Sequence, residues 1–200
     1  CECAYQIAKR GINVRLFEMK PTKKTAAHKS DLFCELICSN SLKALRIESA
    51  AGLLKEEMRR LDSLLMRCAD KCAVPAGGAL AVNRDDFSAM VTKEIRNNPL
   101  IEVIEKEVTE IPNDAITVIA AGPLASEVLS AEIQKICGGG LSFFDAAAPI
   151  VTAESIDMEK AFFASRYDKG GDDAYINCPM NKDEYEAFYE ALVSAERTPL

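Results

Sequence analysis

Cysteine thiols are the most reactive side chains in this sequence, and one of them has a distinctive setting. Cys38 lies between an apolar run and Ser39-Asn40-Ser41, three residues that favour caps and turns. If a helix begins at this junction, its N–H groups would favour the thiolate, which is the nucleophilic form of cysteine. The alternative is a buried cysteine that serves as a small apolar side chain. The local sequence is compatible with both interpretations.

Metal binding is a second chemistry that the cysteines suggest. Cys34 and Cys38 are four residues apart, as are Cys68 and Cys72, and four thiolates can hold a tetrahedral Zn²⁺. Both pairs lie within apolar patterns, however, which are typical of buried cysteines. We therefore expect no metal site. The single histidine, His28, lies in a polar loop, and the sequence suggests no Ser/His/Asp triad.

Glu18 is a candidate ligand for a nucleotide because of the elements that precede it. Residues 4–10 have a helical pattern that ends at Gly11, and residues 12–17 alternate as in a half-buried strand. In a dinucleotide-binding βαβ unit, the acid at the end of such a strand hydrogen-bonds a ribose hydroxyl. The Gly-rich first half of that unit would precede Cys1, so we expect an internal piece of a longer protein. The alternative is an ordinary surface glutamate at a strand end.

Two segments with small residues are suited to a close approach by a ligand. Gly77 and Gly78 lack side chains that would block access to backbone N–H groups. An apolar run ends in Ala121 and Gly122, and small residues at the carboxyl end of a sheet leave room for a cofactor. Both segments are equally compatible with ordinary tight turns. Residues 21–30 are polar and basic, which is typical of a solvated loop or of a phosphate contact.

The spacing of apolar residues predicts the elements that must position these side chains. Helices are expected over residues 52–72, from Asp85 or Asp86 to residue 98, over 124–137 and after Met180. Strands are expected over residues 79–82, 101–104, 107–111 and 116–120, and a short apolar element over 32–38. This alternation predicts an α/β fold with a largely parallel sheet. A change in character near residue 147 predicts one domain over residues 1–146 and the start of a second over 147–200.

Composition excludes several classes of protein. With 48% hydrophobic and 28% charged residues, the sequence is typical of a globular protein and not of a disordered one. No apolar run approaches the roughly 20 residues of a membrane span, and no signal peptide is recognisable. We therefore expect a cytoplasmic protein with reduced thiols. A net charge of −7 argues against a nucleic-acid partner, because phosphate binding requires clustered Lys and Arg.

An ordered series of sequence blocks nevertheless resembles one enzyme family that acts on RNA. The blocks are EMKP at 18–21, ELICSNSL at 35–42, GLLKEEMR at 52–59, VPAGGALAVNR at 74–84, DAAAPIV at 145–151, SRYDKG at 165–170 and YINCPM at 175–180. Together they resemble the bacterial folate- and FAD-dependent tRNA (uracil-5-)-methyltransferases. The resemblance extends over essentially the whole chain.

The resemblance implies a fold and an activity. The fold would be a glutathione-reductase-type, Rossmann-like FAD-binding domain, truncated at its N-terminus and followed by the start of an α+β insertion domain. The activity would be methylation of C5 of uridine 54 in the tRNA T-loop. The one-carbon donor would be 5,10-methylenetetrahydrofolate, and FAD reduced by NAD(P)H would be the reductant. A piece of 200 residues is expected to be inactive alone.

The resemblance also assigns roles to individual residues. Cys38 matches the family cysteine that is implicated in the uridine chemistry. A thiolate suits this role, because its addition to C6 of uracil makes C5 nucleophilic. Glu18 would bind the FAD ribose, and Ala121 and Gly122 would pass close to FAD. Further neighbours of the cofactor would be Lys20, Gly77, Gly78 and Arg84.

Two alternative functions stay open. The first is the related FAD- and folate-linked protein that modifies the tRNA wobble uridine, although that family should lack the Cys-Ser-Asn-Ser run found at residues 38–41. The second is a non-catalytic FAD- or RNA-binding module that keeps the fold without turnover.

Overall fold

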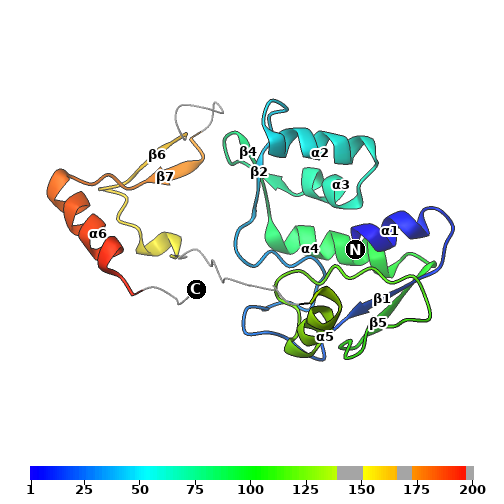
Figure 1. The fold of residues 1–200 in the computed structure, drawn as a ribbon. Helices are drawn as coiled ribbons and strands as arrows, with labels where there is room; N and C mark the ends of the chain where they lie inside the picture. The colour runs from blue at the N-terminus through cyan, green and yellow to red at the C-terminus, as the bar shows by residue number, and fades with distance from the viewer. Residues whose placement is uncertain (139–150, 166–172, 197–200) are drawn as a thin grey trace. The chain divides into compact units, whose positions relative to one another are not determined.

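The computed structural model describes residues 1–138, 151–165 and 173–196 (Figure 1). The chain divides into two units, one made of Cys1–Val74 and Gly78–Ala148 and the other of Pro75–Gly77 and Pro149–Leu200. The predicted boundary at residue 147 lies outside the described residues. So does most of the blocks at 145–151 and 165–170.

A parallel pair of strands forms one part of the first unit. Helix α1 (Glu2–Ala8) precedes strand β1 (Val14–Glu18), and Gly11 reverses the chain between them with a φ of +78°. Strand β1 pairs in parallel with β5 (Ile101–Glu105), with Val14 opposite Ile101 and Glu18 opposite Glu105. The α/β class is therefore confirmed.

A second, antiparallel sheet lies in the same unit. Its order is β2-β4-β3, formed by β2 (Ser41–Ala44), β4 (Ala79–Val82) and β3 (Ala73–Val74). Among the described residues the β1–β5 sheet is parallel, as predicted, whereas the pairings of β2, β3 and β4 are antiparallel, so the strand pairing is mixed and not largely parallel.

Three helices flank this sheet in sequence: α2 (Ala50–Arg60), α3 (Leu64–Lys71) and α4 (Arg84–Arg96). The predicted single helix over residues 52–72 is wrong. The chain breaks at Asp62, which has a φ of +55°, and the Ser63 hydroxyl then caps α3 by accepting from Met66 N–H. Both helices contribute apolar side chains to one core, so the apolar spacing continues across the break. The spacing therefore does not reveal that the helix ends at this point.

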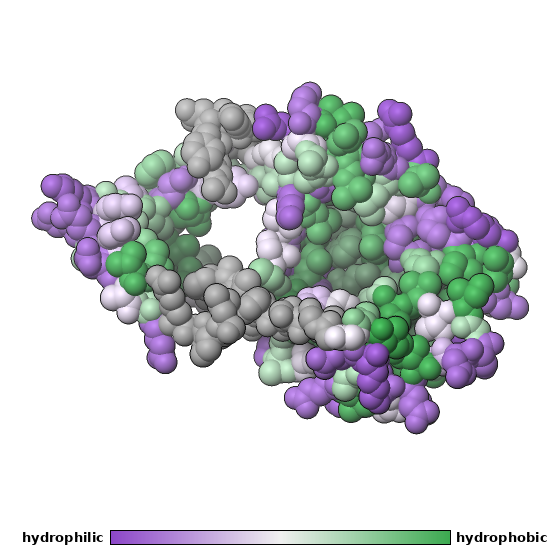
Figure 2. All heavy atoms as spheres, in the orientation of Figure 1, coloured by the Kyte–Doolittle hydropathy of each residue, from purple (hydrophilic) through white to green (hydrophobic). Residues whose placement is uncertain are grey.

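The core of the first unit gathers around α4 and the apolar face of α3. Its fully buried side chains include Leu64 of α3, Val82 of β4, and Val91 and Ile95 of α4. Phe33, from the long loop after β1, is also buried in this cluster. Apolar side chains also remain on the surface, where Figure 2 shows them as green areas among purple polar residues.

Two predicted strands and one predicted apolar element are not regular structure. Residues 107–111, 116–120 and 32–38 contain neither helix nor strand. The side chains of Ile116, Val118 and Ile119 are exposed, and no described strand pairs with that run. Without a neighbouring strand the backbone groups have no ladder to join, so apolar composition alone does not form a strand. Helix α5 (Glu127–Cys137) begins three residues later than predicted and ends at Gly138, which has a φ of +74°.

The second unit contains a hairpin and one helix. A short 3₁₀ turn, η1 (Ala153–Ser155), precedes β6 (Phe162–Ala164), which pairs antiparallel with β7 (Tyr175–Asn177). Helix α6 (Lys182–Ser194) starts with a capping box in which the Asn181 and Glu184 side chains each accept the other residue's backbone N–H. None of the helices in the described ranges has the length and apolar character needed to cross a bilayer.

Candidate functional site

Cys38 lies near the end of the long loop that connects β1 to β2, and its side chain is exposed. The element that follows is strand β2, so no helix N-terminus lies at this position. The alternative of a buried structural cysteine is also wrong, because solvent reaches the thiol. An exposed thiol can react with a large substrate such as a nucleic-acid base.

The backbone after Cys38 is attached to the sheet through Asn40. Its side-chain amide donates to the Val82 carbonyl at 3.0 Å, and Val82 N–H donates to the Asn40 carbonyl at 3.0 Å. Val82 ends β4, and Arg84 begins α4 two residues later. The same attachment therefore brings the Cys38 loop close to the start of α4.

A cavity of about 270 Å³ lies next to this loop. Its lining comes from the loop and from the first turns of α4, and comprises Ala27, Lys29, Ser30, Glu35, Leu36, Ile37, Arg84, Asp85 and Ser88. The start of α4 is held by its cap, because the Asn83 side chain accepts from the N–H groups of Asp85 and Asp86 at 3.1 and 3.2 Å. Arg84, a predicted cofactor neighbour, thus lines the same cavity as Ile37, the residue before Cys38.

Glu18 is placed at the carboxyl end of β1, as the sequence predicts. One of its carboxylate oxygens accepts from the backbone N–H of Lys20 at 3.0 Å, which fixes the orientation of the group. The side chain is half-buried. The carboxyl end of a parallel strand is where ligands bind in α/β sheets, so the position suits an acceptor for a ribose hydroxyl.

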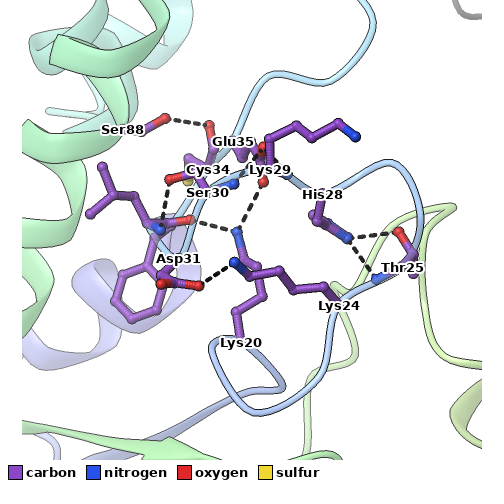
Figure 3. Close-up of polar contacts among 12 residues, drawn as sticks. Lys20, Lys24, Thr25, His28, Lys29, Ser30, Asp31, Cys34, Glu35 and Ser88 are labelled. Carbon is purple, nitrogen blue, oxygen red and sulfur yellow. Dashed lines mark hydrogen bonds and ion pairs between the residues drawn. The ribbon is translucent and has the colours of Figure 1, made fainter.

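The Lys20 ammonium points into the protein (Figure 3). The residue is only 4% exposed, and Nζ donates to the Leu32 carbonyl at 2.6 Å and lies 3.5 Å from the Glu35 carboxylate. Glu35 also accepts from the backbone N–H groups of Lys29 and Ser30, at 2.7 and 3.0 Å. Its own burial raises the pKa of Glu35, but these donors and Lys20 outweigh it and lower the pKa overall.

The remaining predicted residues lie elsewhere on the chain. Gly77, with a φ of +58°, and Gly78 form the turn between β3 and β4, and the Gly78 carbonyl accepts from Leu45 N–H at 2.9 Å. Ala121 and Gly122, the latter with a φ of +70°, lie in the irregular segment before α5. Of the predicted cofactor residues in the described part of the chain, only Arg84 lines the cavity.

Sequence reasoning missed two hydroxyl residues that support this loop. Ser88 and Thr92 are buried on the otherwise apolar face of α4. The Ser88 hydroxyl donates to the Cys34 carbonyl at 3.3 Å, and Phe33 N–H donates to the Thr92 hydroxyl at 2.8 Å. The two residues are four positions apart on the face of the helix that packs into the core. Since buried polar groups need hydrogen-bond partners, this spacing could have indicated that they bind another segment.

Backbone conformation around Cys38 is unusual. Cys34 and Lys43, which flank the loop end that carries Cys38, have φ values of +54° and +68°. Residues other than glycine rarely adopt this left-handed region, and such strain clusters at functional sites. No pattern in the sequence predicts these two conformations.

Two of the cysteines whose spacing suggests zinc binding are buried away from solvent. Cys68 and Cys72 are buried in the first unit, and burial raises the pKa of Cys68 to about 11. A thiol that resists ionisation is a poor metal ligand. Within the described part of the chain, no three His, Cys, Asp or Glu side chains gather into a group that would hold a metal ion.

Comparison with known proteins gives closely similar relatives. A protein from Acetivibrio thermocellus is 61% identical over 197 residues, which cover 98% of this chain and 45% of the relative. Proteins from Lactococcus lactis subsp. cremoris and Anoxybacillus flavithermus are each 58% identical over 200 residues, covering 44% and 46% of their lengths. All three are named methylenetetrahydrofolate–tRNA-(uracil-5-)-methyltransferase TrmFO. The chain therefore spans less than half the length of these relatives.

The family comparison covers the chain completely. The sequence pattern of the family described as "Glucose inhibited division protein A" (GIDA) matches residues 1–200. The match includes the β1 segment, the Cys38 loop and the cavity-lining start of α4. The chain therefore belongs to the GIDA family.

Proposed function

We propose that the whole protein containing this chain methylates C5 of uridine in tRNA, with 5,10-methylenetetrahydrofolate as the one-carbon donor. The target would be uridine 54 of the T-loop, and FAD reduced by NAD(P)H would supply the reducing equivalents. The proposal rests on one observation above all: Cys38 is exposed and directly follows Ile37, which lines a cavity, in a chain 61% identical to a protein named for this reaction. The reaction would take place in the cytoplasm.

The Cys38 thiolate would act on the pyrimidine ring. Uracil C5 is a weak nucleophile, and a bond from Sγ to C6 breaks the C5=C6 double bond and moves its electron pair to C5 and O4. C5 can then form a bond to the methylene carbon of the folate, as one of the two bonds from that carbon to folate nitrogen breaks and the nitrogen takes up a proton. Loss of the C5 proton and departure of the thiolate restore the ring and regenerate Cys38. Two electrons and a proton must still reach the transferred carbon as its remaining bond to folate nitrogen breaks, which releases tetrahydrofolate and leaves a methyl group on C5.

In this proposal, residues of this chain would hold the FAD cofactor. Glu18 lies half-buried at the end of a parallel strand, where it would accept from the ribose. Arg84 lines the cavity and supplies a positive charge, while Gly77, Gly78, Ala121 and Gly122 would permit close approach of the cofactor. Lys20 would contribute only through its backbone N–H, which donates to the Glu18 carboxylate at 3.0 Å, since its ammonium is engaged by Leu32 and Glu35. When bound, reduced FAD supplies the two reducing equivalents.

The decisive experiment is the Cys38→Ser substitution in the full-length protein. Methylation of T-loop RNA with labelled methylenetetrahydrofolate should fall by roughly 10⁴-fold or more, as when a nucleophile is removed. The flavin absorbance spectrum should be unchanged. Cys137→Ser is the matched control, because Cys137 is also exposed but lies in α5. Wild-type methylation by Cys38→Ser would exclude the proposed role.

The alternative functions give different results in the same assay. Modification of an anticodon stem-loop, with none of T-loop RNA, would indicate a wobble-uridine enzyme. Flavin or RNA binding without transfer of the label would indicate a non-catalytic module. We also retain the proposal that an insertion domain begins at residue 147, after a FAD-binding domain over residues 1–146. Limited proteolysis of the full-length protein would test that boundary.

A further inference from the structure

Four consecutive residues of the long loop, Leu32 to Glu35, are each held by a side chain or backbone group from elsewhere (Figure 3). Two of these contacts come from α4, through the buried hydroxyls of Thr92 and Ser88. The other two centre on Lys20 and Glu35. These contacts hold a segment that contains neither helix nor strand.

The Lys20–Glu35 pair differs from the ion pairs elsewhere in the described residues. The side chains of Lys20 and Glu35 are 4% and 12% exposed, whereas every other ion pair has at least one partner that is more than 30% exposed. A buried ammonium needs several directed partners, and Lys20 has the Leu32 carbonyl together with the Glu35 carboxylate. The pair is therefore a specific clamp between the end of β1 and the loop.

Cys38 lies between this clamp and a second point of attachment. Glu35 is three residues before it, and Asn40, which pairs with Val82, is two residues after it. Glu35 and Asn40 are joined by five steps of at most about 3.6 Å each, so the residues between them cannot move far while both ends are held. Release of one end would allow the thiol to move by more than a bond length.

We propose that Lys20 and Glu35 are positioning residues, which hold the Leu32–Glu35 segment so that the loop end carrying Cys38 stays next to the cavity that Ile37 lines. The proposal rests on the proposed function of Cys38. Although Glu35 lines the cavity, the role proposed here requires no contact of Lys20 or Glu35 with the substrate. Both act through the backbone that leads to the thiol, and neither needs to touch a cofactor.

The first test measures local motion and needs no activity. Lys20→Met and Glu35→Gln keep the size of each side chain and remove its charge. In the full-length protein, amide hydrogen exchange in a peptide covering residues 36–40 should rise roughly tenfold in both variants, because local opening becomes easier. Exchange in α4 should stay as in the wild type. The matched control is Lys23→Met. Lys23 lies in the same loop as Lys20, and its substitution removes an ion pair to Glu107 at the surface.

The second test measures turnover. Misplacement of a reacting group by about 1 Å costs roughly 10²-fold in rate, so kcat for T-loop methylation should fall on that scale in both variants. The KM for RNA and the bound flavin should be unchanged. A fall in flavin content would instead make the pair a cofactor-binding element, and this would overturn the proposal.

The two tests separate this proposal from the proposed function. If wild-type protein does not methylate RNA but the exchange pattern is as expected, the proposed function is wrong and the clamp is supported. If wild-type protein is active and both variants match Lys23→Met in exchange and kcat, the clamp is wrong. Exchange that rises equally in α4 would show global destabilisation and would also contradict the proposal. Glu35→Gln alone decides the matter if Lys20→Met does not fold, because Gln still offers an acceptor to the Lys29 and Ser30 N–H groups.

Discussion

At the scale of single residues, cysteine side chains in this fold differ in their exposure to solvent and therefore in their reactivity. Cys38 is exposed in the loop before β2, whereas Cys68 is 1% exposed in the core. Burial disfavours the charged thiolate and raises the pKa of Cys68 to about 11. Eight cysteines in the sequence thus do not represent eight reactive thiols.

This contrast predicts the order of thiol modification. At pH 8, iodoacetamide should label Cys38 at least roughly a hundredfold faster than Cys68, because only the accessible thiolate reacts. Mass spectrometry of the digested protein reports each site separately. In concentrated urea the two rates should converge, which serves as the control. Equal rates in the folded protein would show that Cys68 is not buried as described.

Gly52 is a residue whose smallness the structure requires. A Cβ atom built on it would lie 1.9 Å from the Arg46 carbonyl oxygen and 2.8 Å from that of Leu45. Both atoms belong to the backbone, so neither can rotate away. The glycine therefore permits the start of α2 to pack directly on the chain that leaves β2.

Gly52→Ala should accordingly destabilise the protein by about 2–3 kcal/mol, the cost of overpacking. Urea denaturation followed by circular dichroism gives the free energy of unfolding. Gly78→Ala is the matched control, because a Cβ there meets nothing within 4 Å and the backbone has no positive φ. If both substitutions have the same effect, the close approach at Gly52 is not real.

At the scale of elements, the start of α3 is stabilised by an acid from α1. The Glu2 carboxylate accepts from the N–H groups of Leu64 and Leu65, at 3.2 and 2.9 Å, and from the Ser63 hydroxyl at 2.8 Å. Burial raises the pKa of Glu2, but the hydrogen bonds outweigh it and the pKa is lowered from its ordinary value of 4.5. A carboxylate at a helix N-terminus also interacts favourably with the helix dipole.

A lowered pKa has a defined effect on stability. The ionised Glu2 side chain contributes its full stabilisation above pH 4.5, which is its pKa in the unfolded chain. This stabilisation is lost as the pH falls through the lower pKa of Glu2 in the folded protein. Glu2→Gln should cost about 1.5–3 kcal/mol at pH 7, the value of hydrogen bonds to a charged group. The difference from wild type should shrink below pH 4.5. Chemical denaturation at several pH values checks this, and a difference that is independent of pH would contradict it.

Elements also show where periodicity succeeds and where it does not. Helix α4 was predicted to within two residues, because Asn83 caps it and its buried residues Phe87, Val91 and Ile95 recur at helical spacing. The break between α2 and α3 was not predicted. It depends on the left-handed conformation of Asp62, and aspartate is also common within continuous helices.

At the scale of the whole molecule, stability of the first unit depends on a few fully buried side chains. Ile95 of α4 is completely buried, whereas Leu61 is 73% exposed. Ile95→Ala should reduce the free energy of unfolding by about 2–5 kcal/mol, because a cavity remains. Leu61→Ala should change it by no more than about 0.5 kcal/mol. Thermal or urea unfolding checks both, and a small effect at Ile95 would mean that α4 does not form the core.

The sequence by itself determined the family resemblance, the α/β class, the position of Glu18 at a strand end and the candidacy of Cys38. These follow from local order, namely motif letters, strand ends and helical spacing. Only the tertiary structure decided that the Cys38 loop is irregular, that Arg84 lines its cavity and that Lys20 turns inward to Glu35. Such contacts join residues 15 to 59 positions apart, and their energy depends on burial and direction, which no local pattern encodes.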